Sequence, residues 1–471
     1  MRPRIYIETH GCQMNEADSE TIARRAERAG YDIAERFDEA SVVVLNTCTV
    51  RDNAEQRAYG RINHWKSLKL ADPSVKVVVA GCLAEQDRDR MLVLAPHVDA
   101  IFGTKELSRL GDALAAWRDG FVDEEYDEHV EARALLAPVG GRPDGLPDAY
   151  GALRAFVNVQ RGCSYYCTFC IVPHVRGRFD HRPIGEVVAE VRGRIASGAR
   201  EITLVGQTVN AWREPATGAD FADLLEVVAS IDGLERLTFV TSHPKDFTEK
   251  LARTMGAIPS INPRMHLPFQ SASNPVLRRM NRKYTIEEYR DKLAMIDAYV
   301  PNCALTTDIV VAFPGESEDD FEKTVAFCAE RRFAQAYMFI YSPRRGTPAS
   351  HWEQIPASVG GERLRRLAAV VDAGVSAYHA HKVGSTVRVL VHGPSRRDAQ
   401  RLSGKTVDNV TAAFASDENP KAPDIARPWA DVRVDAAHVW GISGTLLRRA
   451  ATYDAAGEAV APPVIDLIAV S

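Results

Sequence analysis

The feature that most constrains this chain is a run of three cysteines, Cys163, Cys167 and Cys170, spaced CxxxCxxC directly after the apolar stretch 155–160. That stretch predicts a short buried strand, so the cysteines are expected on a loop that leaves it. Three thiolates this close in sequence can bind one metal centre and leave one position of a four-site centre open. Iron–sulfur clusters are held by cysteine thiolates, usually four. A four-iron cluster held by only three has one iron free to bind a small molecule.

Other interpretations of this loop start from the same residues. A disulfide framework is not expected, because three clustered cysteines leave one over and the chain shows no sign of secretion. Zinc is the stronger alternative, since His174 follows Cys170 by four residues and could complete a tetrahedral site with Cys163, Cys167 and Cys170. Self-contained zinc modules are short, however, whereas this loop opens a long α/β segment. A cluster is therefore the favoured interpretation, with zinc and inert thiols as alternatives.

A second set of cysteines, Cys12, Cys48 and Cys82, lies in residues 3–119. Each follows a predicted strand of a βα unit. The strands are 4–8, 41–45 and 75–80, the helices are 16–29, 51–69 and 85–94, and a weaker strand follows at 98–102. This alternation predicts a doubly wound parallel sheet, whose ligand crevice lies at the carboxyl ends of the strands. One such cysteine could simply be a small buried residue, but three at the same strand end predict a second three-thiolate site.

Residues 149–380 repeat the strand–helix pattern six times. The predicted strands are 155–160, 201–205, 236–240, 264–268, 305–311 and 336–341. Six units are too few to close an eight-stranded barrel, so an open, partial (βα)6 barrel is expected. Active residues of such barrels come from the carboxyl ends of the strands. Four polar stretches at those ends predict a pocket for an adenosine-sized ligand, namely 206–210, 241–244, 270–274 and 313–316.

The remaining segments differ in composition. Residues 120–148 are acidic and then rich in Gly and Pro, which predicts a linker. Residues 382–450 carry short strands, at 386–392, 429–434 and 438–442, with turns typical of a small β-barrel, and 451–471 would form a tail.

The predicted small barrel is locally basic. Between residues 384 and 450, ten Lys and Arg outnumber seven Asp and Glu. Four of them, Arg396, Arg397, Arg401 and Lys405, cluster in one predicted hairpin. Such a cluster can be just a solvated face, but on a β module of this size it indicates contact with RNA phosphates.

The whole-chain totals limit the other possibilities. A length of 471 residues suggests about three domains, and 45% hydrophobic with 26% charged residues is typical of a globular protein. A net charge of −5 predicts that any nucleic-acid surface is local. Neither a signal-peptide pattern nor an apolar run of about 18 residues is present, so a cytoplasmic protein without membrane contact is expected. Cys303 and Cys328 have no spacing partner and are expected in the core.

Several longer stretches resemble one known family, the radical S-adenosylmethionine (SAM) methylthiotransferases. They are THGCQMNEADS, LNTCTVRDNAE, AGCLAEQ, RGCSYYCTFCIVPHVRGR, LVGQTVN, SHPKDF, HLPFQSASNPVLRRMNRKYT, TDIVVAFPGE and GPSRRDAQRLSGKTVDN, and they span nearly the whole chain. Within the family the chain is most similar to the bacterial branch that acts on N(6)-dimethylallyladenosine in tRNA, because GCQMN and GPSRRD are more specific than the shared cysteine motif. The chain departs from the family at His10, where an aromatic residue is usual, and at Ala272 and Ala312, where glycine is usual.

The resemblance implies a methylthiotransferase domain, a radical SAM core and a TRAM domain, in that order. Cys163, Cys167 and Cys170 would hold a [4Fe–4S] cluster whose open iron binds SAM, and one electron would then release a 5′-deoxyadenosyl radical that removes the hydrogen from carbon 2 of the adenine. The N-terminal cysteines would hold an auxiliary [4Fe–4S] cluster, where sulfur is methylated and transferred. The family has no ligand at the position of His174, which argues against zinc.

The resemblance also implies partners and further site residues. The residues expected in the SAM pocket are Phe169, Gln207, Ser242, Gln270 and Asp308, and those expected to bind RNA are Arg396, Arg397, Arg401 and Lys405. The expected partners are a tRNA substrate and an electron donor such as flavodoxin or ferredoxin, and a monomer is expected.

Three alternative functions remain at this point. Sibling enzymes with the same cysteines act on threonylcarbamoyl-adenosine in tRNA or on a ribosomal-protein aspartate. The loop 207–210 and the GPSRRD hairpin favour the dimethylallyl-adenosine branch instead. A non-catalytic iron–sulfur protein that binds RNA is disfavoured by the second cysteine set and the intact motifs around the predicted pocket.

Overall fold

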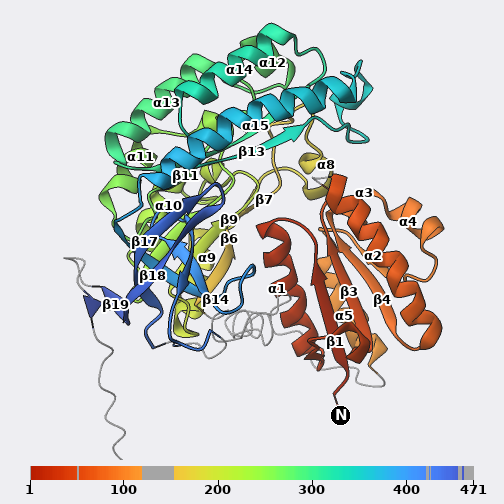
Figure 1. Ribbon diagram of the computed structural model, residues 1–471. Coiled ribbons are helices and arrows are strands. Elements are labelled where there is room, and N and C mark those ends of the chain that lie inside the picture. Colours follow the sequence, from red (N-terminus) through yellow and green to blue (C-terminus); the bar gives the residue numbers. More distant parts are fainter. Residues whose placement is uncertain are drawn as a thin grey trace, which may run out of the picture.

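The structure is a computed structural model that describes residues 2–49, 52–118, 153–420, 424, 426–453 and 459–460. Figure 1 shows three parts, an N-terminal sheet with helices in red and orange, a larger central domain, and a C-terminal barrel in blue. The predicted linker at 120–148 and most of the predicted tail lie outside the described residues. Within the described ranges, no helix combines the length and the apolar character needed to span a membrane.

The N-terminal domain contains a five-stranded sheet in the order β2–β1–β3–β4–β5, with all neighbours parallel. The strands are β1 (Arg4–Thr9), β2 (Asp32–Ile33), β3 (Val42–Thr47), β4 (Lys76–Gly81) and β5 (Ala100–Phe102). The strand order reverses between β1 and β3, and ligands of such sheets bind where the carboxyl ends of the strands part. The predicted parallel sheet is confirmed, while the two-residue β2 was missed because two residues carry no periodicity.

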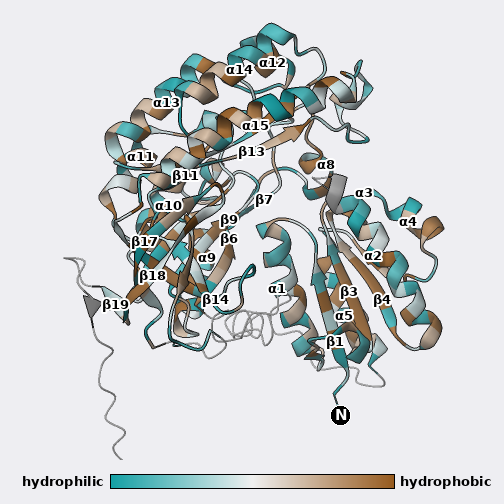
Figure 2. Cartoon of the chain, viewed as in Figure 1, coloured by the Kyte–Doolittle hydropathy of each residue, from teal (hydrophilic) through white to brown (hydrophobic). Residues whose placement is uncertain are grey.

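Helices cover both faces of this sheet because alternate strand residues point to opposite sides. They are α1 (Gln13–Arg28), α2 (Asp52–Ala71), α3 (Cys82–Gln86), α4 (Arg88–Leu94) and α5 (Leu110–Trp117). Val42 and Val44 pack with α1 and α5, whereas Val43 and Leu45 pack with α2, α3 and α4. Figure 2 shows β3 and β4 as brown, apolar strands between these helices. The single helix predicted at 85–94 is wrong, since two helices meet at Asp87 and the first begins at Cys82.

The central domain is an open barrel of six strands in sequence order. They are β6 (Arg154–Asn158), β9 (Glu201–Val205), β10 (Arg236–Phe239), β11 (Arg264–His266), β12 (Ala304–Val311) and β13 (Gln335–Ile340). They form two three-stranded parallel sheets joined by a bridge from Leu237 to Ile261. No strand pairing joins β13 back to β6 within the described part of the chain, so the predicted partial barrel is confirmed.

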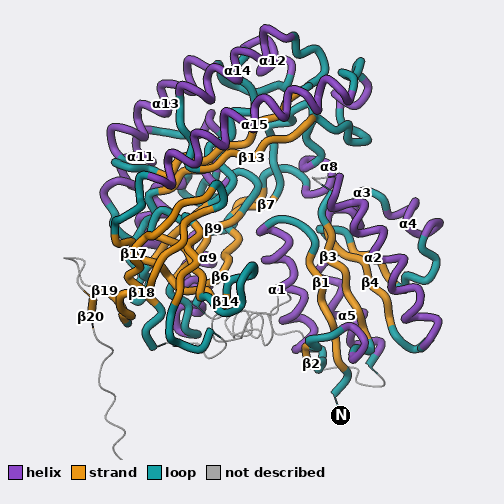
Figure 3. The backbone as a smooth tube through the Cα atoms, viewed as in Figure 1, coloured by secondary structure: helices purple, strands orange, loops and turns teal. Residues whose placement is uncertain are grey.

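Helices surround the outside of this barrel, and Figure 3 shows them as purple coils around the orange strands. They are α9 (Ile184–Ala196), α10 (Phe221–Ala229), α11 (Glu249–Ala257), α12 (Asn274–Arg279), α13 (Ile286–Tyr299), α14 (Glu318–Glu330) and α15 (Ala357–Ala380). Between helices and strands lies one large core, in which Phe269, Tyr289 and Phe327 are fully or almost fully buried. Cys328 belongs to this core and Cys303 packs against it, as predicted.

The C-terminal domain is a closed five-stranded barrel in the order β14–β15–β16–β18–β17. The strands are β14 (Thr386–Pro394), β15 (Leu402–Thr406), β16 (Thr411–Ala415), β17 (Trp429–His438) and β18 (Gly441–Ala450), and a short pair β19 (Thr452–Tyr453) and β20 (Ala459–Val460) follows. The small barrel is confirmed, but the strand predicted at 438–442 is wrong. Val439 and Trp440 form the turn between β17 and β18, and Gly441, with φ 144°, allows its backbone to pass close to Thr411.

Candidate iron–sulfur sites

The CxxxCxxC cysteines lie on the loop between β7 (Gln160–Arg161) and α8 (Val172–Arg176). The N–H of Cys170 donates to the carbonyl oxygen of Cys167 at 3.0 Å, and this turn brings the last two cysteines together. Burial raises the pKa of Cys170 to about 12, with a further contribution from Cys167. Burial also raises the pKa of Cys163. Thiols in such a setting ionise when a metal centre compensates their charge, which fits a cluster site.

Position 162 of this loop accepts only glycine. Its φ is 69°, and a Cβ there would lie 1.9 Å from the backbone oxygen of Arg178. The N–H of Gly162 donates to Oε1 of Gln207 at 2.5 Å. On the other side of the loop, Oε1 of Gln160 accepts the N–H of Thr208 at 3.0 Å. Gln207, predicted for SAM binding, therefore also fixes the cysteine loop against the end of β9.

Three barrel strands end in strained backbone. Thr241 after β10, Gln270 after β11 and Ala312 after β12 have φ values of 66°, 68° and 55°. This left-handed conformation costs about 1–2 kcal/mol for a residue with a Cβ, and such strain clusters at functional sites. Ala312 stands where the resembling family usually has glycine, the residue that adopts this conformation without strain. The strained residues mark the predicted pocket rim.

The predicted pocket residues occupy this rim in different ways. Ser242 is 7% exposed, and its Oγ has no hydrogen-bond partner within the described residues. A buried hydroxyl without a partner is costly, so this atom fits a site that a polar ligand completes. The N–H of Gln270 donates to the carbonyl oxygen of Asp308 at 3.0 Å, which joins two more of these residues. The ring of Phe169 instead packs edge-on against Phe313 at 6.2 Å.

A buried arginine contacts one of the loop cysteines. Nη1 of Arg282 donates to Sγ of Cys167 at 3.3 Å, and its Nη2 donates to the carbonyl oxygen of Pro268 at 3.1 Å. Arg282 is 9% exposed and also donates to the hydroxyl of Tyr284. Its cation can offset the negative charge that three thiolates bring. Arg282 could not be found from the sequence, because 115 residues separate it from Cys167 and only the fold brings the two together.

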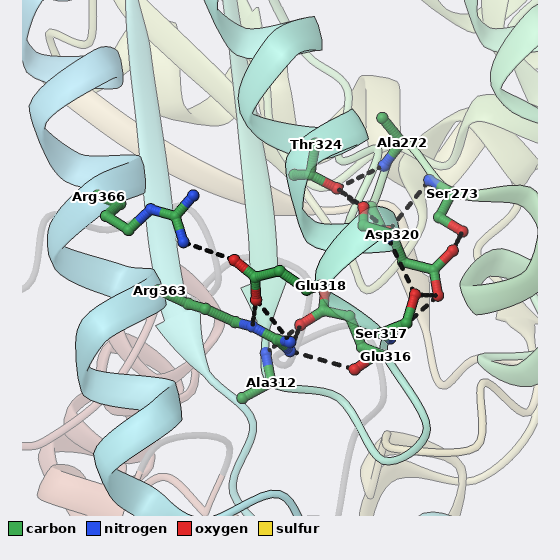
Figure 4. A network of polar contacts seen from close by, with 11 residues as sticks. Ala272, Ser273, Ala312, Glu316, Ser317, Glu318, Asp320, Thr324, Arg363 and Arg366 are labelled. Atoms are coloured by element: carbon green, nitrogen blue, oxygen red, sulfur yellow. Dashed lines mark hydrogen bonds and ion pairs between the residues drawn. The ribbon is translucent and has the colours of Figure 1, made fainter.

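Figure 4 shows the polar network that holds the turn after β12. The N–H of Ala312 donates to Oε2 of Glu316 at 2.7 Å, and Nη1 of Arg363 on α15 donates to the same oxygen at 2.8 Å. Burial raises the pKa of Glu316 to about 7, even though Ala312 and Arg363 favour its ionised form. The same figure shows Thr324 of α14 accepting the N–H of Ala272 at 3.0 Å. The two turns after β11 and β12 are therefore tied to α14 and α15.

The second set of cysteines meets at the carboxyl ends of β1, β3 and β4. Cys12 precedes α1, Cys48 follows β3, and Cys82 begins α3. A hydrogen bond with Cys48 and the guanidinium of Arg176 together lower the pKa of Cys12 to about 6. A Cβ on Gly11 would lie 2.7 Å from the Cβ of Cys48, so glycine allows this close approach. Residues 36 and 34 positions apart thus come together as the strand-end pattern predicts.

Two asparagines fix the surroundings of this second set. Nδ2 of Asn46 donates to the carbonyl oxygen of Asn15 at 2.8 Å, and Nδ2 of Asn15 donates to that of Thr47 at 3.0 Å. Both asparagines are fully buried. They hold the first turn of α1 against the end of β3, so the stretches CQMN and LNTC position Cys12 and Cys48 relative to each other.

The zinc alternative has no support in this geometry. Throughout the described ranges, no three side chains of His, Cys, Asp or Glu converge closely enough to hold one metal ion. A four-iron cluster spreads its thiolates more widely than a single ion does. His174 is exposed and lines a cavity of about 250 Å³ together with Glu85 and Arg345, at the boundary with the N-terminal domain.

The basic hairpin of the small barrel is formed by β14 and β15. Arg396 and Arg397 are exposed on the connecting loop, and Arg401 closes it by accepting the N–H of Ser395 on its carbonyl oxygen at 2.8 Å. Lys405 lies on β15, three residues after its first residue Leu402. Its Nζ donates to Oγ1 of Thr411. Burial and then the charge of neighbouring arginines lower the pKa of Lys405 to about 8. The structure thus separates Lys405 from the three arginines, and RNA binding by all four stays a prediction.

Comparisons with known proteins agree with this arrangement. The model of the Uncharacterized protein family UPF0004 matches residues 4–103, and that of the Radical SAM superfamily matches 157–328. The tRNA-2-methylthio-N(6)-dimethylallyladenosine synthase of Desulfitobacterium hafniense is 40% identical over 446 residues, covering 94% of this chain and 97% of the relative. The chain belongs to the tRNA-2-methylthio-N(6)-dimethylallyladenosine synthase family. The family member of Pseudomonas fluorescens is 38% identical, over 95% of this chain and all of the relative.

Solved structures support the fold of this family member. The radical SAM methyltransferase TsrM from Kitasatospora setae matches with a TM-score of 0.52 and 15% identity, over 74% of this chain and 77% of TsrM. At this identity the match shows the fold alone. Membership of the radical SAM superfamily implies one [4Fe–4S] cluster and SAM, and the loop thiols, Arg282 and the partnerless hydroxyl of Ser242 fit both groups.

Proposed function

We propose that this chain is a tRNA methylthiotransferase that adds a 2-methylthio group to N(6)-dimethylallyladenosine, with SAM and two [4Fe–4S] clusters. The observation that carries the proposal is the pair of three-cysteine sets, one on the loop after β7 and one at the carboxyl ends of β1, β3 and β4. A contact between Cys82 and Arg176 joins the two sets. Near full-length relatives that carry this activity in their names support the choice of reaction.

Cys163, Cys167 and Cys170 are proposed to hold the radical SAM cluster, with Arg282 balancing charge at Cys167. When bound, this cluster supplies the electron that cleaves the sulfonium of SAM. The chain's own part is placement. Gln207 fixes the cysteine loop, and the Oγ of Ser242 is available to a polar group of SAM. Gln270 and Asp308 are proposed to line the same pocket.

Cys12, Cys48 and Cys82 are proposed to hold the auxiliary cluster that provides sulfur. The lowered pKa of Cys12 favours a thiolate ligand at neutral pH. Loading both sites should give about eight iron per chain, from four per cluster. A protein that binds about four iron yet makes methylthiolated tRNA would contradict the second cluster.

The small barrel is proposed to hold tRNA through Arg396, Arg397 and Arg401. Arg396 and Arg397 are exposed and Arg401 is half-buried at the end of the same loop, and arginines grouped in this way can contact successive phosphates without reading the bases. A flavodoxin or ferredoxin is the proposed electron donor, and the enzyme is proposed to act as a monomer in the cytoplasm.

Mass spectrometry of tRNA nucleosides tests the reaction and the substrate together. In a strain that lacks the gene, 2-methylthio-N(6)-dimethylallyladenosine should disappear and its unmethylthiolated precursor should accumulate. The wild-type gene should restore the product, whereas Cys167→Ala should not. Loss of methylthiolated threonylcarbamoyl-adenosine or of a modified ribosomal-protein aspartate instead would assign the chain to one of the sibling activities.

A further inference from the structure

The contact between Arg176 and Cys82 joins the central domain to the N-terminal domain. Arg176, on α8 of the central domain, donates through Nε to Sγ of Cys82 at 3.3 Å and through Nη2 to Oδ2 of Asp18 at 2.7 Å. The side chains of Arg176 and Asp18 are 6% and 3% exposed, and Cys82 is 2% exposed. One buried guanidinium is therefore shared between a carboxylate and a cysteine sulfur of the other domain.

The position of Arg176 in the chain links the two cysteine sets. Helix α8 begins two residues after Cys170, so one short segment supplies a thiol to the first set and an N–H to the second. Ile171 and Val175 of this segment pack directly against Cys82. Figure 1 shows α8 beside α3 at the meeting of the two domains.

The other contacts across this boundary are largely polar. Arg194 of α9 pairs with Glu20 of α1 at 3.0 Å, and Arg345 pairs with Asp87 at 3.0 Å. Polar boundaries between domains resemble transient interfaces and leave room for relative motion. Buried ion pairs add little net stability, although in some proteins they select one geometry. Among these contacts, the one made by Arg176 links the orientation of the two domains to the position of Cys82.

A hydrogen bond to a ligand sulfur also acts on the cluster that the sulfur holds. Reduction adds negative charge to an iron–sulfur cluster, and an N–H donor or a nearby cation stabilises that charge. Hydrogen bonds to the sulfurs are among the factors that set reduction potentials. The Nε–H of Arg176 is therefore placed to raise the reduction potential of a cluster bound through Cys82.

We propose that Arg176 is a positioning residue that couples the two cysteine sets. It holds Cys82 in a fixed place relative to the radical SAM loop, and it raises the reduction potential of the cluster at Cys12, Cys48 and Cys82. This inference rests on the auxiliary cluster of the proposed function. What it adds is that an arginine of the central domain sets the reduction potential and the position of the cluster in the N-terminal domain.

A redox titration followed by electron paramagnetic resonance tests the tuning. The parent protein is the full chain with Cys163, Cys167 and Cys170 replaced by Ala, so that only the N-terminal set can bind a cluster. Arg176→Met should shift the midpoint of the signal to a lower potential, and Arg176→Lys should shift it less. Asp18→Asn should shift it upward, because it removes a negative charge and leaves the guanidinium.

Arg194→Met is the matched control for the domain boundary. It breaks the partly buried interdomain ion pair with Glu20 without touching a cysteine, so the midpoint should stay at the parent value. Hydrogen–deuterium exchange of the amides in 171–176 should increase in Arg176→Met, which reports the loss of positioning independently of any activity.

The possible results separate this inference from the proposed function. A parent protein without any cluster signal would overturn both. A parent with the signal, together with an unshifted midpoint in Arg176→Met, would overturn only the role of Arg176. An equal downward shift in Arg194→Met would assign the effect to domain contact in general and would likewise overturn it. If Arg176→Met does not retain iron, the same criteria apply to Arg176→Lys.

Discussion

In the protein without bound iron, Cys12 should be an unusually reactive thiol. Cys12 is exposed, and its pKa is lowered to about 6 by the hydrogen bond with Cys48 and by the charge of Arg176. A thiol with an ordinary pKa near 9 is roughly 1% thiolate at pH 7. A thiol with a pKa of about 6 is roughly 90% thiolate at the same pH, so the reactive form of Cys12 is enriched about 90-fold.

The expected gain in rate is smaller than this gain in thiolate. Nucleophilicity falls as the pKa falls, with a Brønsted coefficient of about 0.4–0.5, so three pKa units cost about 15- to 30-fold. Cys12 should therefore react roughly 3- to 6-fold faster than an ordinary exposed thiol at pH 7. Cys82 should behave oppositely, because burial raises its pKa to about 11 and leaves it 2% exposed.

The assay is a brief reaction of chelated, anaerobic protein with a small aromatic disulfide, read by peptide mass spectrometry from pH 4.5 to 8.5. Circular dichroism should first show that the chelated protein remains folded. Labelling of Cys12 should rise with a midpoint near pH 6, and Arg176→Met should move that midpoint upward. Labelling of Cys12 that shows no midpoint near pH 6 and still rises at pH 8.5, or equal labelling of Cys12 and Cys82, would refute the reasoning.

Three further predictions concern the loop, the barrel and the hairpin. Gly162→Ala places a methyl group against the backbone oxygen of Arg178. The protein should therefore lose the radical SAM cluster and bind about four iron instead of about eight, and an unchanged iron content would contradict this. Arg363→Met leaves the buried carboxylate of Glu316 without its cation (Figure 4) and should lower the free energy of unfolding by about 3 kcal/mol, which a lower thermal midpoint would show. The same change at the half-exposed Arg366 should lower it by under about 1 kcal/mol. Replacing Arg396 and Arg397 by Ala should weaken tRNA binding and flatten its salt dependence by roughly 0.7–0.9 per lost contact, while SAM cleavage without tRNA survives.

The strands and the cysteine positions could be predicted because they are local patterns. Apolar periodicity locates a strand, and the rule for parallel sheets then places whatever follows it at a common edge. That is why Cys12, Cys48 and Cys82 could be predicted to lie at one edge of the sheet. The same reasoning wrongly predicted a strand through Val439 and Trp440, because the apolar pattern continues through the turn. The only local sign of that turn is Gly441, which follows it.

The contacts that complete the sites could not be predicted in this way. Arg176 reaches a cysteine 94 positions earlier, and Arg282 reaches one 115 positions earlier, so both contacts depend on packing between distant elements. The strained conformations of Thr241 and Gln270 carry no local signal either, because neither residue type favours a left-handed backbone. The cofactors could be predicted from the family resemblance, whereas the contacts of Arg176 and Arg282 with cysteines are seen only in the structure.

The central claim is that the two cysteine sets have separate roles, and Cys48→Ala tests it most directly. The measurement is the yield of 5′-deoxyadenosine and of methylthiolated tRNA in one reaction with reductant, SAM and tRNA, after the folding of the variant has been verified. The account predicts that Cys48→Ala still forms appreciable 5′-deoxyadenosine but no methylthiolated tRNA, whereas Cys167→Ala forms neither. Methylthiolated tRNA from Cys48→Ala at near wild-type yield would contradict the account, because the transferred sulfur would then come from elsewhere.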